Sequence, residues 1–103
     1  MKSRKETLEE FVAVDPNDSF SRYALALELE KEGEEANAVV QFRQVIDRDS
    51  SYVAAYYHLG KVLARTGHDD EARDVYRKGL IAALAANDQR TSTEIQEALD
   101  ALD

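Results

Sequence analysis

The chain repeats itself with a period of 34 residues. Six positions carry the same residue one period later: Tyr23 and Tyr57, Leu25 and Leu59, Leu29 and Leu63, Gly33 and Gly67, Ala38 and Ala72, and Arg43 and Arg77. A fixed period in this range is typical of helical-repeat proteins, because each unit buries its apolar face only by stacking on its neighbours. The repeat therefore predicts a binding module rather than an enzyme.

Composition supports one helical domain and argues against several functions. The 103 residues include four glycines, one proline and no cysteine, so we expect a compact domain without disulfides. The net charge of −8 opposes binding to nucleic acid or to an anionic membrane surface, because both need basic patches. No apolar run approaches the roughly 20 residues of a membrane span, and the charged N-terminus lacks the apolar core of a signal peptide. We expect a cytoplasmic protein that needs no cofactor and inserts into no membrane.

Apolar residues recur at helical spacing along the whole chain, which predicts six helices and no strand. The first helix covers residues 3–14. Asp18 or Ser19 is expected to cap the second, which stops near Gly33, since glycine adopts the left-handed backbone that often ends a helix. The third covers residues 35–48.

The second half of the chain follows the same pattern. Ser50 or Ser51 is expected to cap the fourth helix, and Gly67 ends it. The fifth helix opens on acidic residues, which suit the positive end of the helix dipole, and it stays apolar to its end as a platform for the last helix. Thr91 and Glu94 have the spacing of a capping box and predict the start of a short sixth helix.

These positions resemble the slots of the tetratricopeptide repeat, a helix-turn-helix unit of this period. The second unit fills the slots with Tyr56, Leu59, Gly60, Leu63, Gly67, Ala72, Tyr76 and Gly79, and the first unit with Leu25, Ala26, Leu29, Gly33, Ala38, Phe42 and Val45. The resemblance implies an all-α fold of antiparallel helix hairpins, stacked as a short right-handed superhelix. It divides a single domain, residues 1–103, into a half repeat (3–14), two full repeats (19–52 and 53–86) and a capping helix (91–103).

Three departures from the family pattern concern packing. Arg22 stands in a slot where the family prefers a large aromatic residue, Val45 replaces the expected small residue, and Leu84 stands where a repeat closes with proline. Without that proline, the second helix of the second repeat is expected to run a turn or more longer than usual.

The resemblance implies that a peptide or a partner helix binds along the surface lined by the first helix of each repeat. The side chains on that side are Phe20, Tyr23, Leu27 and Lys31 from the first repeat, and Tyr57, His58, Lys61 and Arg65 from the second. Aromatic and basic residues are frequent energetic anchors of interfaces. Our hypothesis is that an acidic or carboxylate-ended segment binds here. The alternative is an ordinary solvated face on which Tyr57 packs locally.

Other chemistry has little support in the sequence. Some family members hold a C-terminal carboxylate with a clamp of lysines, asparagines and an arginine, but the matching positions here include Tyr23 and Leu27, and a third full repeat is missing. The two histidines have no serine or cysteine partner that suggests a catalytic triad. The acidic residues after His68 suit a first helical turn better than a metal site. The acidic run at residues 28–35 is interpreted as a solvated face.

Self-association is the main competing function. The first helix lacks one of its two expected neighbours, so Leu8, Phe11 and Val12 would form an apolar surface at the end of the stack. A symmetric homodimer can bury such a surface. The apolar segment at residues 80–86 is a second candidate surface.

Overall fold

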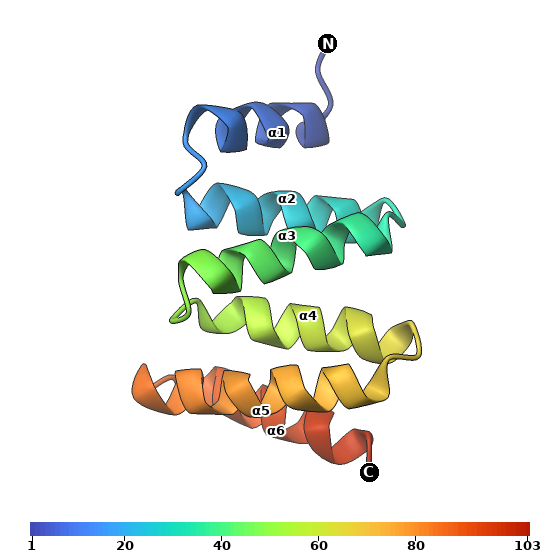
Figure 1. Ribbon diagram of the computed structural model, residues 1–103, viewed down its shortest axis with the longest axis vertical. Coiled ribbons are helices and arrows are strands. Elements are labelled where there is room, and N and C mark those ends of the chain that lie inside the picture. The colour runs from blue at the N-terminus through green and yellow to red at the C-terminus, as the bar shows by residue number, and fades with distance from the viewer. The chain divides into compact units, whose positions relative to one another are not determined.

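A computed structural model describes all 103 residues of the chain, and it confirms the prediction of six helices and no strand (Figure 1). The helices are α1 (Arg4–Val14), α2 (Ser19–Lys31), α3 (Glu35–Arg48), α4 (Val53–Arg65), α5 (Asp69–Ala85) and α6 (Gln89–Ala101). They form two compact units, Met1–Asp49 with α1 to α3 and Ser50–Asp103 with α4 to α6. None of the six helices combines the length and the apolar composition that crossing a bilayer requires.

In the first unit, α2 and α3 pack side by side and α1 packs against α2 (Figure 1). The fully buried apolar side chains are those of Ala26, Ala38, Phe42 and Val45. On α1, Leu8 is buried, while Phe11 is 53% exposed. The small residues Ala26 and Ala38 allow α2 and α3 to approach closely, and Phe42 fills the remaining space.

Two ion pairs join α1 to the acidic run at residues 28–35. Arg4 Nε lies 3.4 Å from Glu28 Oε2, and Lys5 Nζ lies 3.0 Å from Glu34 Oε2. The interpretation of this run as a plain solvated face is therefore wrong for these two glutamates. The amphipathic spacing of α1 gives no sign of these contacts, because both partners are long side chains that reach across from another helix.

Two carboxylates in the first unit have lowered pKa values. The hydrogen bond from the Ser21 hydroxyl, helped by the bond from the Ser21 amide, lowers the pKa of Asp18 below its ordinary 3.8. The hydrogen bond from Lys5 and its positive charge lower the pKa of Glu34 below 4.5. The folded chain thus binds protons less readily than the unfolded chain in acid. These groups stabilise the fold above their ordinary pKa values, and this contribution is lost as the pH falls through the lowered values.

Acid is therefore expected to destabilise the chain. The midpoint of thermal unfolding, followed by circular dichroism, should stay level above about pH 5 and fall below about pH 4. Glu34→Gln should make that fall shallower, whereas Glu97→Gln, on the exposed side of α6, should leave it unchanged. Equal acid profiles for wild type and Glu34→Gln would contradict the assignment. The pKa of Lys5 shifts in the opposite direction, because Glu34 raises it above its ordinary 10.5. The stabilisation that Lys5 contributes is therefore present below about pH 10.5 and is lost as the pH rises further.

Arg22 is buried in the aromatic slot of the first unit, with 6% of its surface exposed. Its Nη1 donates to Gln41 Oε1 and Gln44 Oε1, both at 2.8 Å, and its Nη2 donates to the Pro16 carbonyl oxygen at 3.2 Å. Burial lowers the pKa of Arg22, and the charge of Arg48 adds to this effect. The two glutamine oxygens and one carbonyl thus replace water at the two terminal nitrogens of the buried cation, whereas its Nε has no hydrogen-bond partner.

The same slot in the second unit shows why arginine fits. Tyr56 lies one period after Arg22, and its hydroxyl donates to the Ser50 carbonyl oxygen at 2.8 Å. Ser50 likewise lies one period after Pro16. In both slots, a long side chain thus reaches the carbonyl of the turn before the helix with its polar tip.

In the second unit, α4 and α5 pack side by side, and α6 packs against both. The fully buried apolar side chains include those of Ala55, Val62, Ala72, Ala83 and Ile95. Helix α5 has 17 residues, compared with 14 in α3, so it extends beyond the missing proline by slightly less than the predicted turn. Ala83 lies within that extension and is buried, but Ile81 and Leu84 are 69% and 72% exposed. The predicted platform for the last helix, the apolar end of α5, therefore uses only one side of the helix.

Helices α2, α4 and α5 end in the same way. Gly33 and Gly67 have φ values of 82° and 86°, as predicted for glycines that end helices. After α5 the left-handed residue is Asn87, with φ of 56°. The amides of Glu34, His68 and Asp88 donate to carbonyls five residues earlier, at 2.9, 2.8 and 2.9 Å. Asparagine is the residue other than glycine that most readily adopts this backbone in a helix cap.

Two predicted helix starts are wrong. Tyr52, not Ser50 or Ser51, precedes α4, and no side chain caps it. Helix α6 begins at Gln89 because the Asp88 carboxylate accepts the Thr91 amide at 3.0 Å. Aspartate and threonine both suit a cap, and Asp88, which directly follows the left-handed Asn87, takes the role.

Candidate functional site

The predicted residues of α2 lie on the side of the helix that faces away from buried Leu25. Phe20 is 69% exposed and Lys31 is exposed, while Tyr23 and Leu27 are half-buried. The ring of Tyr23 lies 6.1 Å from that of buried Phe42, at an angle of 60°. These four predicted residues, Phe20, Tyr23, Leu27 and Lys31, are called the α2 face. One side of Tyr23 is therefore held by the core and the other contributes to the α2 face.

Tyr57 contacts two of the other predicted residues of α4. Tyr57 and His58 are half-buried, with ring centroids 5.5 Å apart in an edge-to-face arrangement. The Lys61 ammonium lies 5.0 Å from the centroid of the Tyr57 ring, within the range of a cation–π contact. Arg65 follows one turn later and is exposed. Tyr57, His58, Lys61 and Arg65 are called the α4 face.

Each of these two faces carries a lysine that forms no ion pair within the chain. Of the five lysines in the chain, Lys2, Lys5 and Lys78 form ion pairs with carboxylates of the same unit. The other two, Lys31 and Lys61, form no ion pair within the chain. Both belong to the predicted faces. In a chain with a net charge of −8, unpaired ammonium groups on these faces favour an acidic ligand.

The phenol beneath the α4 face stays protonated. Burial, with a smaller contribution from Tyr57, raises the pKa of Tyr76 to about 12. This hydroxyl is therefore neutral throughout the physiological range and serves packing rather than proton transfer. No group of three or more histidine, aspartate or glutamate side chains is placed to share a metal ion.

The sequence did not predict a shallow cleft in the second unit. Its volume is about 440 Å³, and it is lined by Ser50, Ser51, Tyr56, Lys78, Ile81, Ala82, Ala85 and Ala86. Four of these residues, Lys78, Ile81, Ala82 and Ala85, have the spacing of one side of a helix. That spacing was visible in the sequence, but whether α6 covered this side was not.

The helix hairpins and their repeated caps define a helical-repeat protein, and comparison with known proteins gives the family. The sequence model of the tetratricopeptide repeat matches residues 2–85. The chain belongs to the tetratricopeptide repeat family, which confirms the resemblance found in its sequence, and its fold is that of a protein-interaction module. No curated protein sequence matches the chain.

Solved structures agree with the family. The chain is 36% identical to a tetratricopeptide repeat domain protein from Salinibacter ruber, with a TM-score of 0.79 over 82% of this chain and 94% of that one. It is 29% identical to a protein from Bordetella parapertussis, with a TM-score of 0.84 over 99% and 89% of the two chains. The TPR2B domain of yeast Sti1, solved in complex with pHsp70, is 16% identical, with a TM-score of 0.90 over 95% and 78%. At that identity the last likeness concerns the fold alone.

Proposed function

We propose that the chain is a non-catalytic interaction module whose α2 and α4 faces bind an acidic peptide or partner helix. The observation that carries the proposal is that Lys31 and Lys61, the two lysines without an ion pair in the chain, both lie on these faces. We also propose that residues 1–103 act as one domain in which both repeats contribute to binding.

The aromatic residues give these faces the contact area that a peptide needs. Phe20 is largely exposed, and Tyr23 and Tyr57 stand one period apart on equivalent turns of α2 and α4. Tyrosine loses little side-chain entropy on binding, because its ring is rigid, and both tyrosine rings here already have packing partners. Such pre-organised rings support apolar contact with little ordering cost.

The α4 face supports the choice of an acidic ligand. The Lys61 ammonium is exposed and lies over the Tyr57 ring, and Arg65 adds a second exposed cation on the same side of α4. A carboxylate of the ligand would pair with Lys61 while an adjacent apolar side chain rests against Tyr57. The yeast relative, which was solved in complex with pHsp70, shows that this fold can hold a protein ligand.

Reversal of the α4 charges is expected to abolish capture of the partner. The tagged chain is used in an affinity capture from native lysate, and wild type is compared with Lys61→Glu/Arg65→Glu. A partner bound by wild type should not be recovered with the variant. With the purified partner, the variant's dissociation constant should be about tenfold higher or more. The matched control is Lys2→Glu/Arg90→Glu, which changes the net charge by the same amount on exposed side chains of α6 and the N-terminus. It should leave binding intact.

Circular dichroism confirms first that each variant is folded. Equal recovery of the same partner by wild type and by Lys61→Glu/Arg65→Glu would contradict the proposal. Loss with the control as well would show that binding responds to net charge and not to the α4 face.

Self-association is a second candidate function, favoured by two exposed apolar surfaces. On α1, Phe11 and Val14 are 53% and 85% exposed, and on α5, Ile81 and Leu84 are 69% and 72% exposed. Contiguous exposed apolar patches are typical of interaction sites. A molecular mass in solution that rises with concentration would support this candidate, and a constant monomer mass would exclude it.

A further inference from the structure

The outer side of α5 carries a coiled-coil-like stripe that no helix of the chain covers. Its residues are Asp70, Asp74, Arg77, Ile81 and Leu84, at alternating spacings of four and three residues, and all five are exposed. This alternation places side chains on one seam of a helix and is the pattern through which two helices pair. These five residues are called the α5 stripe. It is polar in its first half and apolar in its second.

We propose that the α5 stripe binds the α5 stripe of a second copy of the chain, with the two helices antiparallel and Ile81 of each copy against Leu84 of the other. The proposal rests on the self-association candidate above and is independent of peptide binding by the α2 and α4 faces. It assigns self-association to α5 and not to α1.

Charge supports the antiparallel register. In this register Arg77 and Lys78 of one copy lie beside the C-terminal end of α5 of the second copy. Arg77 is exposed and forms no ion pair within the chain. The last turn of α5 contains no basic residue of its own, so the negative end of the helix dipole lacks a cation that the second copy would supply. Because the dimer has two-fold symmetry, this contact between cation and helix end would occur twice in it.

A parallel pairing has no such complementarity. Equivalent residues would face each other along the stripe, so that Asp70, Asp74 and Arg77 would each meet their own copy. Like charges at facing positions destabilise a helix pair. The charge pattern therefore selects the antiparallel arrangement, in which Asp70 lies far from the two-fold axis.

The shape of the second unit also suits a second copy. The cleft of about 440 Å³ opens beside Ile81, and small side chains, Ala82 and Ala85, form part of its lining. Small residues let two helices approach closely, and an exposed large apolar side chain can then enter the space between them. Leu84 is such a side chain, at 72% exposed. The same helix thus offers both a projecting side chain and a cleft.

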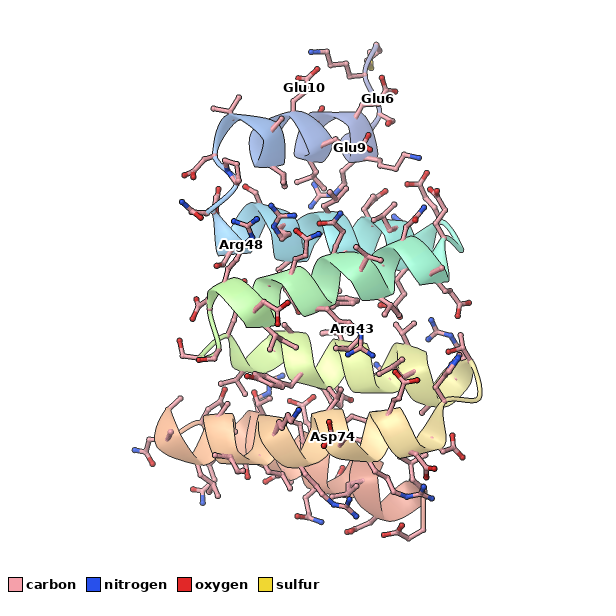
Figure 2. The ribbon with its side chains drawn as sticks, viewed as in Figure 1. Glu6, Glu9, Glu10, Arg43, Arg48 and Asp74 are labelled. Carbon is pink, nitrogen blue, oxygen red and sulfur yellow. The ribbon has the colours of Figure 1, made fainter.

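The exposed apolar residues of α1 are less suited to pairing. Glu6, Glu9 and Glu10 all lie on α1 (Figure 2) and are exposed. Glu10 pairs with Lys2, whose Nζ lies 2.6 Å away, and the charge of Glu9 acts on Lys5. Two copies of α1 would bring these carboxylates together, which opposes association in a chain that is already acidic.

Sedimentation equilibrium over a wide range of concentrations tests the proposal. Two apolar side chains per copy bury little area compared with the roughly 1,200–2,000 Å² of a stable complex. The dimer should therefore be reversible and should be populated only at high protein concentration. Leu84→Glu and Ile81→Glu should each weaken dimerisation at least tenfold. Both residues are exposed, so neither change disturbs the core. The matched control is Phe11→Glu, which should leave dimerisation unchanged.

Because the chain contains no cysteine, single cysteines report the register. In the antiparallel pair, residue 84 of the two copies lies about 5 Å apart along the helix axis, and residue 70 about 37 Å apart. A short thiol cross-linker should therefore join Leu84→Cys chains and not Asp70→Cys chains. Cross-linking of both would indicate a parallel pair and overturn the proposal. A monomer at every concentration would overturn both this inference and self-association, whereas a dimer lost only with Phe11→Glu would overturn this inference and leave self-association standing.

Discussion

Gly60→Ala is expected to lower the free energy of unfolding by about 1–3 kcal/mol, or more. A Cβ at Gly60 would lie 2.7 Å from Cζ of Tyr76 and closer still to two other ring carbons. Tyr76 is 2% exposed, so its ring has no free space into which to move. The expected loss is a net value, because alanine also favours the helix by about 1 kcal/mol over glycine. Chemical denaturation followed by circular dichroism measures it.

The first unit provides the matched control. Ala26 lies one period before Gly60 and is fully buried. Ala26→Gly should cost about 1 kcal/mol from helix propensity alone. In the second unit, adding Tyr76→Leu to Gly60→Ala should recover part of the stability, because the shorter side chain removes the ring. A Gly60→Ala chain as stable as wild type would show that α4 and α5 are not held as closely as the structure has them.

Phe42→Ala is expected to have the largest effect, a loss of about 3–5 kcal/mol in the free energy of unfolding. Phe42 is 0% exposed, so its removal leaves a cavity that the close approach of α2 and α3 cannot fill. It also removes the ring against which Tyr23 packs, 6.1 Å away. The same denaturation experiment measures this loss. Binding through the α2 face should weaken in parallel, because Tyr23 then loses its support.

Phe42→Leu is the control for this change. It keeps most of the volume and should cost less than half as much as Phe42→Ala, since the residual cavity sets the cost. A loss below about 1 kcal/mol for Phe42→Ala would mean that the site collapses around the gap. That result would contradict the account of a tightly packed interface between α2 and α3.

The helices could be predicted because the period of 34 residues and the helical spacing point to the same boundaries. The glycines at 33 and 67 mark two helix ends, and the structure gives both the expected left-handed backbone. The starts of α4 and α6 were predicted less well. Each lies in a segment with several capping residues in a row, and the choice among them depends on how the preceding turn closes.

Packing at Arg22 could not be predicted from residue type. A charged residue in an aromatic slot suggests poor packing. Arg22 is nevertheless buried, and it donates hydrogen bonds to three acceptors. Two of these, Gln41 and Gln44, lie about twenty residues away on α3. Their role becomes visible only when α2 and α3 are side by side.

The candidate faces were predicted from helical spacing alone, since residues opposite a buried stripe must point outward. The structure adds the contact of Lys61 with Tyr57 and the absence of an ion pair at Lys31 and Lys61. The exposure of Ile81 and Leu84 was not predicted, because it depends on which side of α5 the last helix covers. The partner itself cannot be read from the fold, since one scaffold serves many ligands.

The most direct test of the central claim is to map the binding site by amide chemical shifts. The isotope-labelled chain is titrated with the partner recovered in the affinity capture, or with the acidic segment of that partner. We predict that the largest shifts occur at Tyr57, Lys61 and Arg65, with smaller ones on the α2 face. Shifts confined to α1 or to the α5 stripe, with the α4 face unchanged, would contradict the account.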